Sequence, residues 1–281
     1  MREILRFEHV SYGYDVGSTE KPALRDCSVS VGEGERIAVL GNNGAGKSTF
    51  FLLANGVLQP REGTVFYQGN PVGRSSRDRN LLRRGVGLVF QDPEVQILGG
   101  TVEEEISFGP MNLGLPEAEV RRRVEAEIRH FSLEALRKRA PQYLSGGEKK
   151  RVSIADVMAM EPRVLLLDEP AASLDPANCR LLEENLERME ARGLSFLIAT
   201  HDVEFAWRWA RRLLIFCDGE LVADGAPESV FADQALLDTC HLEQPLLFRV
   251  ARALKIAPAP KTIEALEHEM ICGKRPLERR T

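Results

Sequence analysis

Short apolar stretches along the chain predict a series of β-strands. Residues 5–12, 27–31 and 36–40 are rich in β-branched and aromatic side chains and are separated by glycine-containing turns, which is typical of strands. Residues 163–169 and 194–202 differ, because they are continuous apolar runs that end in polar residues. Such runs are typical of strands buried on both faces of a parallel sheet. The helices between these strands should then form right-handed crossovers.

A second pattern, with apolar residues at helical spacing among many charges, extends from about Gln91 to Ser145 and predicts a helical insertion. After about Asp233 no further strand pattern follows. Only residues 245–254 and 262–270 favour short helices there, on either side of a Pro-rich segment. We therefore predict an α/β domain over residues 2–232 with a helical subdomain over about 92–160, followed by a C-terminal extension over 233–281.

Composition is that of an ordinary globular protein, with 281 residues, 43% hydrophobic and 28% charged. The net charge of -5 gives no electrostatic reason to expect nucleic acid as a partner. No apolar run approaches the roughly 18–20 residues that cross a bilayer, and the N-terminus lacks the apolar segment of a secretory signal. We therefore expect any link to a membrane to depend on partner proteins. The five cysteines are widely spaced, which argues against a zinc site and a disulfide framework and favours a reducing cytosol.

Residues 41–48 match the phosphate-loop pattern GxxxxGK[ST] and lie between a predicted strand and a predicted helix. The glycines let successive backbone N–H groups point at phosphates, where the helix N-terminus adds partial positive charge. Lys47 should reach the β- and γ-phosphates of ATP, and the Ser48 hydroxyl should bind Mg²⁺. The motif alone does not separate kinases, GTPases and ATPases. The residues predicted to contact the nucleotide here are Gly41, Asn42, Asn43, Gly44, Ala45, Gly46, Lys47, Ser48 and Thr49.

Polar residues at the ends of three predicted strands are suited to ATP hydrolysis. Asp168 and Glu169 end one apolar strand, and we expect the first to hold Mg²⁺ and the second to activate the attacking water. The alternative is that this pair only caps the next helix. His201 follows a second strand and should lie at the same sheet edge if the two strands are parallel, where it could contact the γ-phosphate. Gln91 ends a third strand and is a candidate ligand for Mg²⁺ or water.

Residues 144–148, LSGGE, precede another predicted helix, so Ser145, Gly146 and Gly147 should present a hydroxyl and free N–H groups at a helix N-terminus. This makes a second candidate anion-binding site, to which Glu148 also belongs. One γ-phosphate does not need two complete loops from one chain. The second loop is therefore expected to serve a nucleotide held by another subunit, although a glycine-containing helix cap is the simpler alternative for SGG alone.

Together these motifs resemble those of ABC ATPases over about residues 2–232. The resemblance implies a P-loop NTPase core with a mainly parallel sheet, an N-terminal antiparallel β subdomain and a helical ABC subdomain. It implies that Tyr14 stacks on adenine, with Tyr12 as the competing candidate. It also implies that two such domains, copies or paralogues, sandwich two ATP molecules between the phosphate loop of one and the signature of the other. The matching Walker A, Q-loop, signature, Walker B, D-loop and H-loop segments are residues 41–49, Gln91, 144–148, 164–170, 173–175 and His201.

Within that family, residues 86–124 and 144–162 resemble the ATPases of energy-coupling-factor (ECF) importers, especially the cobalt and nickel type. Those systems join two ATPase subunits to a transmembrane coupling protein and a separate substrate-binding membrane protein. The resemblance thus implies a peripheral protein on the cytoplasmic face of the cell membrane that energises import of cobalt, nickel or a vitamin. The sequence departs from the usual pattern at Ala171, Asp156 and residues 97–100, none of which is a catalytic group.

Glu94 and residues 103–105 lie in the segment expected to face the membrane partner, which suggests an acidic groove for a basic coupling helix. A solvated helix face is the commoner explanation for three consecutive glutamates.

Three rival functions remain. The first is a non-transport ABC ATPase of the chromosome-maintenance, DNA-repair or translation kind. The chromosome type would need a long coiled coil, but only 54 positions separate Gln91 from Ser145, and the translation type carries two cassettes. A P-loop kinase leaves LSGGE and His201 unexplained. An ATPase of another ABC transporter class also stays open.

Overall fold

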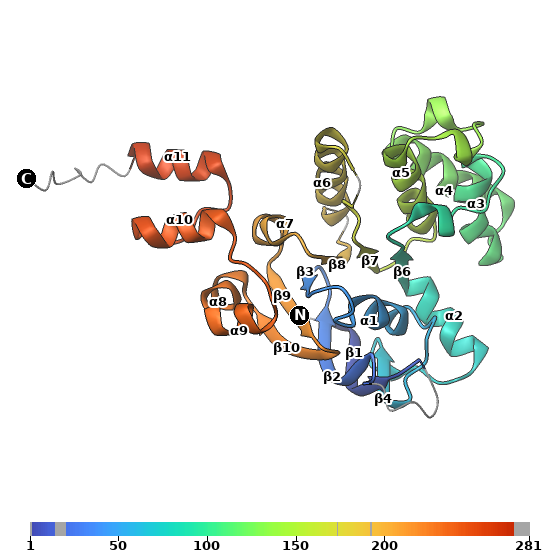
Figure 1. The fold of residues 1–281 in the computed structure, drawn as a ribbon. Helices are drawn as coiled ribbons and strands as arrows, with labels where there is room; N and C mark the ends of the chain where they lie inside the picture. Colours follow the sequence, from blue (N-terminus) through green and yellow to red (C-terminus); the bar gives the residue numbers. More distant parts are fainter. Residues whose placement is uncertain (1, 15–20, 173, 192, 273–281) are drawn as a thin grey trace, which may run out of the picture.

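The computed structural model describes residues 2–14, 21–172, 174–191 and 193–272, which are arranged around two β-sheets (Figure 1). The smaller sheet is antiparallel, with strand order β2-β1-β4-β5. In β2 the alternate residues Cys27, Val29 and Val31 are buried and the residues between them face solvent, as the period-2 pattern predicts. Its strands are β1 (Glu3–Tyr12), β2 (Leu24–Gly32), β4 (Glu62–Tyr67) and β5 (Asn70–Pro71).

The larger sheet has strand order β10-β9-β3-β8-β7-β6 and is parallel except for β10, which is antiparallel to β9. Neighbouring residues of β3 face opposite cores, Ala38 and Leu40 on one side and Ile37 and Val39 on the other. This burial on both faces confirms the predicted α/β class with a mainly parallel sheet. Its strands are β3 (Arg36–Leu40), β6 (Val86–Val89), β7 (Val164–Asp168), β8 (Ser195–Thr200), β9 (Arg212–Cys217) and β10 (Glu220–Gly225).

Helix α1 (Lys47–Ala54) packs between the two sheets. The Phe50 ring lies 4.8 Å from that of Phe7 in β1 and 5.2 Å from that of Phe216 in β9, measured between ring centroids. These aromatic contacts bury a large apolar area on both sides of the helix. The loop that precedes α1 is therefore held by both sheets.

The segment between β6 and β7 contains three α-helices and three 3₁₀ turns, in green at the upper right of Figure 1. Their apolar residues, among them Ile106, Ile128 and Val152, join the core on one face of the parallel sheet. The helices are α3 (Val102–Asn112), α4 (Glu117–His130) and α5 (Gly146–Ala159), with 3₁₀ turns η1 (Pro93–Val95), η2 (Glu134–Leu136) and η3 (Pro141–Tyr143). The remaining helices before residue 226 are α2 (Ser76–Gly85), α6 (Pro176–Glu190) and α7 (Val203–Trp209).

The C-terminal segment forms four helices, α8 (Pro227–Ala232), α9 (Gln234–Thr239), α10 (Leu246–Leu254) and α11 (Ile263–Cys272). The last two confirm the helices predicted from sequence, whereas α9 was not predicted because six residues are too few to show a helical period. The extension is anchored on α7, where the Trp207 ring packs 5.1 Å from that of Phe248 and its Nε1 donates to the Pro260 carbonyl at 3.0 Å.

Candidate functional site

The loop between β3 and α1 needs glycine at two positions for steric reasons. Gly41 and Gly46 have φ angles of 150° and 106°. A Cβ atom would lie 2.4 Å from the Phe216 carbonyl oxygen at the first and 2.7 Å from the Ala23 carbonyl oxygen at the second, closer than atoms approach. Any side chain at either position would therefore push the loop off its two neighbours. The contact of Gly46 with Ala23, more than twenty residues upstream, was not visible in the sequence.

Lys47 lies buried beneath this loop. Its Nζ donates to the carbonyl oxygens of Gly41 at 2.5 Å and Asn42 at 3.2 Å. Burial lowers the pKa of Lys47, while the nearby carboxylates of Glu169 and Asp168 oppose that shift. The amine is thus anchored to the loop and directed at the sheet edge where those carboxylates lie.

The residues predicted to bind Mg²⁺ come together at that edge. The Ser48 Oγ donates to Asp168 Oδ2 at 2.6 Å, and Gln91 lines the same pocket. A hydroxyl, a carboxylate and an amide carbonyl are the hard oxygen ligands that Mg²⁺ prefers, so these residues fit that ion. Strands β6 and β7 pair in parallel, which brings Gln91 and Asp168 to one end of the sheet.

Glu169 and His201 also meet there, as the parallel pairing of β7 and β8 predicts. The His201 Nδ1 lies 3.0 Å from both carboxylate oxygens of Glu169. Glu169 is only 8% exposed, and its backbone N–H donates to the Ala199 carbonyl at 2.9 Å. Its φ of 43° lies in the left-handed region, which a non-glycine residue occupies at a cost and which is common at functional sites.

The resulting pocket has a volume of about 270 Å³ and is lined by Tyr14, Ala23, the phosphate loop, Gln91, Asp168 and Glu169. The Tyr14 hydroxyl lies 3.2 Å from Thr49 Oγ1, and its ring meets that of Tyr12 edge-on at 5.2 Å. Tyr12 itself packs against the core under the antiparallel sheet. Tyr14 is therefore the aromatic residue that borders the pocket.

The LSGGE segment lies elsewhere. Ser145 caps α5 in a capping box: its Oγ accepts from the Glu148 N–H at 3.4 Å, and Glu148 Oε2 accepts from the Ser145 N–H at 2.7 Å. Hydrogen bonds from the backbone N–H and the hydroxyl of Ser145 to the Glu148 carboxylate lower the pKa of Glu148. Gly146 lines a different pocket of about 400 Å³ with Gln91 and Lys149. The described part of one chain therefore does not bring this segment to its own phosphate loop.

Only part of the D-loop segment, residues 173–175, lies within the described residues. Ser173 lies outside the described residues, whereas Asp175 caps α6 by accepting hydrogen bonds from the N–H groups of Ala177 and Asn178, both at 2.9 Å. The N-terminus of α5 packs closely on α6, because a Cβ on Gly147 would lie 2.5 Å from the Asn178 side chain.

The ABC transporter family profile matches residues 24–172, more than half of the chain. The chain belongs to that family. It is an ATP-binding subunit of an ABC transporter, an ATPase coupled to transport, and it resembles the energy-coupling-factor group.

Several relatives of this ABC transporter ATPase illustrate the relationship. It is 41% identical over 91% of its length to an energy-coupling factor transporter ATP-binding protein of Methanospirillum hungatei, of which it spans 63%. It is 43% identical to the cobalt import ATP-binding protein of Rhodobacter capsulatus, with 96% of this chain and 98% of that protein covered. Among solved structures, a CbiO protein from Clostridium perfringens, part of a transporter complex, is 35% identical with a TM-score of 0.75, covering 91% and 100% of the two chains.

One residue of the site was missed by sequence reasoning. Lys150 is buried, and its Nζ donates to the carbonyl oxygens of Phe90 at 3.0 Å and Gln91 at 2.7 Å. Burial lowers its pKa to about 8, against the opposing influence of Asp168 and Asp92. This ATPase thus ties its signature helix to the Gln91 backbone. In the sequence Lys150 lies among other charged residues of a predicted helix, so no pattern distinguished it from the lysine and arginine beside it.

Of the carboxylates proposed to form an acidic groove, Glu94 and residues 103–105, Glu105 is buried and so cannot face a partner, while the groove itself stays a hypothesis for the other three. Glu94 pairs with Lys149 at 2.5 Å and Glu103 pairs with Arg137 at 2.5 Å, while the carboxylate of Glu104 completes the capping box of α3. Glu105 is only 3% exposed, and its Oε2 accepts from the N–H groups of Leu98 and Gly99. Each of these carboxylates thus has a hydrogen-bond or ion-pair partner within the chain.

Among the described residues, no helix is both long and apolar enough to cross a membrane.

Proposed function

We propose that this ABC transporter ATPase energises an importer of the ECF type by hydrolysing Mg·ATP at sites shared between two ATPase subunits. The observation that carries the proposal is the convergence of Lys47 and Ser48, at the start of α1, with Asp168 and Glu169, at the end of β7, on one pocket. A phosphate loop facing two adjacent carboxylates is the arrangement that phosphoryl transfer to water requires.

In this mechanism the backbone N–H groups of the phosphate loop and Lys47 hold the β- and γ-phosphates, and Tyr14 stacks on adenine. Ser48, Asp168 and Gln91 would hold Mg²⁺, which neutralises charge that develops on the phosphates. Glu169 accepts a proton from the attacking water. His201 orients Glu169 through the 3.0 Å contact and lies at the edge where a γ-phosphate would end.

The second half of each site would come from another ATPase subunit. A helix N-terminus is offered by Ser145, Gly146, Gly147 and Glu148, none of which lines the pocket of the chain's own phosphate loop, and this supports the assignment. A bacterial ABC transporter cassette that is 26% identical, with a TM-score of 0.71 and 80% of this chain and 99% of that chain covered, is described as a dimer. The partner is a second copy of this chain or a similar paralogue.

Membrane partners would dock beside Gln91. Four apolar side chains of this region are well exposed: Val95, Leu98, Phe108 and Met111 are 67%, 75%, 54% and 63% accessible. Several large apolar side chains exposed within one short segment of the chain favour a protein interface. We assign this surface to a transmembrane coupling subunit, which places the ATPase on the cytoplasmic face of the cell membrane. A separate membrane protein would bind the cargo, and nucleic acid is not a partner.

The cargo is proposed from the relatives. The Rhodobacter capsulatus protein is named for cobalt import, and this chain covers 98% of it. Cobalt or nickel is therefore our first choice and a vitamin the second. A non-transport ABC ATPase is the alternative class. Co-purification from membranes with the coupling and substrate-binding proteins would support the importer, whereas an ATPase that co-purifies only with soluble partners would favour the alternative.

The Glu169→Gln variant tests the catalytic assignment. The amide keeps the shape of the side chain but accepts no proton, so ATP should bind normally while turnover falls by about a thousandfold. An ATP-bound dimer should then accumulate and be visible by size-exclusion chromatography with light scattering. Lys47→Ala is the matched control, because it should lose ATP binding and form no such dimer. Near-normal turnover of Glu169→Gln would exclude Glu169 as the base.

A further inference from the structure

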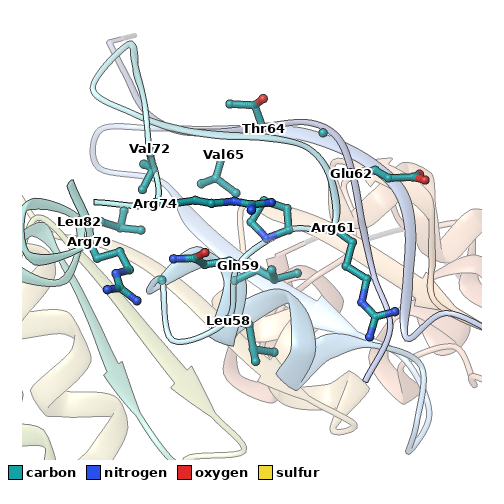
Figure 2. A pocket seen from close by; sticks show the side chains of 15 residues that line it. Leu58, Gln59, Arg61, Glu62, Thr64, Val65, Val72, Arg74, Arg79 and Leu82 are labelled. Carbon is teal, nitrogen blue, oxygen red and sulfur yellow. The ribbon is translucent and has the colours of Figure 1, made fainter. Parts of the chain in front are cut away.

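A second cavity, of about 200 Å³, lies at the C-terminal end of α1, whereas the phosphate-loop pocket lies at its N-terminal end (Figure 2). Its walls come from the end of α1, the turn that follows it, β4, the segment between β5 and α2, and α2 itself. It shares no lining residue with the ATP pocket. Apolar side chains form much of its surface, namely Leu53, Leu58, Val65, Val72 and Leu82.

Arginines provide most of the charge of this cavity. Arg74 and Arg79 line it, and within the described ranges neither has a carboxylate at ion-pair distance. The Nε of Arg79 is buried and makes no hydrogen bond to any described atom, while its Nη2 reaches only the Ser76 Oγ at 3.4 Å. A guanidinium group with a single long hydrogen bond is poorly satisfied, so an anion in the cavity that Arg79 lines would add an acceptor for its remaining N–H groups. In Figure 2 the Arg74 side chain extends across the cavity and that of Glu62 points away.

The other two arginines near the cavity have different contacts. Arg61 also lines it, but its guanidinium carbon lies 5.8 Å from the centre of the Tyr12 ring, on the far side from Arg79. Arg83 donates to the Gly56 carbonyl oxygen at 2.9 Å and so fixes α2 against the end of α1. Arg74 and Arg79 are therefore the two side chains available to bind an anion.

We propose that this cavity is a second ligand site, which binds a small organic anion by its phosphate or carboxylate on Arg74 and Arg79 and by its apolar body against Leu58, Val65 and Leu82. Guanidinium groups match the planar, two-oxygen geometry of such anions. The volume is below the roughly 300–1,000 Å³ of pockets for drug-sized ligands, so the ligand has the size of a singly substituted benzene ring.

The position of this ligand site connects it to the ATPase centre. Helix α1 begins at Lys47, and α2 leads directly into β6, which ends next to Phe90 and Gln91. A ligand held between the two helices thus contacts both elements that lead to the nucleotide pocket. The site goes beyond the proposed transport function and does not depend on it.

Isothermal titration of the full chain with phenyl phosphate tests the proposal. The chain is first saturated with Mg²⁺ and a non-hydrolysable ATP analogue, so that the phosphate loop is blocked. Phenyl phosphate and benzoate should bind, whereas inorganic phosphate, which has no apolar body, and benzyl alcohol, which has no charge, should bind at least roughly tenfold more weakly. Together these probes separate the contribution of the charge from that of the apolar contact.

The Arg74→Ala/Arg79→Ala variant should bind phenyl phosphate roughly tenfold more weakly or worse, because each charged hydrogen bond contributes a comparable factor. Arg84→Ala is the matched control on α2, since Arg84 donates to the Leu113 carbonyl outside the cavity and should leave binding unchanged. Arg79→Lys keeps the positive charge but loses the two-pronged guanidinium group. Its affinity for phenyl phosphate should therefore lie between that of the natural chain and that of the double alanine variant. Unfolding midpoints confirm that each variant is folded.

Two results would overturn the proposal. One is the absence of measurable binding by phenyl phosphate and benzoate up to about 10 mM, a concentration well above the affinity expected of a formed site. The other is binding that the double arginine variant retains in full, which would place the probe elsewhere on the protein.

Discussion

Glu169 shows how one residue is held in an unfavourable conformation at a site. A left-handed φ in a residue other than glycine costs on the order of 1 kcal/mol or more, and it persists only where the surroundings fix it. Here the backbone N–H is bonded to Ala199 and the carboxylate to His201. The same two contacts set the direction of the carboxylate. The strain is thus consistent with a carboxylate whose position matters more than its stability.

Asp156 offers a prediction about stability and pH. Burial, followed by the nearby Glu105, raises the pKa of Asp156 from 3.8 to about 7, and a hydrogen bond with Gln96 opposes the shift. Below about pH 4 the carboxyl is protonated in both the folded and unfolded chain and has no effect. As pH rises further, the unfolded chain ionises while the folded chain keeps its proton, so stability falls until about pH 7 and then levels off.

Asp156→Asn removes this penalty, which is at most about 4 kcal/mol. The variant should therefore be more stable than the natural chain, and the gain in the free energy of unfolding should be larger at pH 8 than at pH 5. Urea denaturation at the two pH values measures the gain. Asp218→Asn is the control, because the Asp218 side chain is 73% exposed and carries no burial penalty for the substitution to remove. An equal gain for Asp156→Asn at both pH values would mean that the carboxyl is ionised in the folded chain throughout.

At the scale of elements, the signature helix α5 and the end of β6 are joined by Lys150. Lys150→Met keeps an apolar side chain of similar length but loses both hydrogen bonds to Phe90 and Gln91, which should cost about 2 kcal/mol of stability. Turnover should fall more than ATP affinity, because the phosphate loop is untouched. Thermal unfolding and steady-state ATPase kinetics measure both effects.

The neighbouring Lys149→Met is the matched control for Lys150. The Lys149 side chain is 14% exposed and pairs with Glu94, which is 68% exposed, so the pair is partly solvated and contributes roughly 1 kcal/mol. Equal effects of the two substitutions on turnover would show that the buried amine does not position Gln91.

The elements also show what sequence can predict. The phosphate loop, the Asp168–Glu169 pair and the strands that carry them were predicted because glycine spacing and unbroken apolar runs are local signals. Lys150 and Glu105 were not recognised as buried, because a lysine or glutamate in a charged helix has the pattern of a solvated residue. Their partners lie on other elements, at distances along the chain that no local pattern encodes. The contact of Ala23 with Gly46 was missed for the same reason.

At the scale of the whole molecule, the phosphate loop and the signature of one chain line different pockets, so a shared site requires two chains. Complementation between two inactive variants tests this directly. Lys47→Ala inactivates the phosphate loop of the chain that carries it. Ser145→Arg blocks the signature of the chain that carries it, because Ser145 is exposed, although the substitution also removes the N-cap of α5. Each variant alone should be inactive as a dimer of copies, although Ser145→Arg should still bind ATP.

An equal mixture of the two variants should recover ATPase activity. In a mixed dimer, the intact phosphate loop of the Ser145→Arg chain faces the intact signature of the Lys47→Ala chain, which restores one of two sites. Because the Lys47→Ala chain forms no ATP-bound dimer with itself, the activity comes from mixed dimers with one working site out of two, so the mixture should reach at most about half of the natural rate. If each site were built within one chain, no pairing could restore it. A mixture as inactive as its components, in a chain whose Glu169→Gln variant still dimerises with ATP, would therefore contradict shared sites while leaving the catalytic assignment intact.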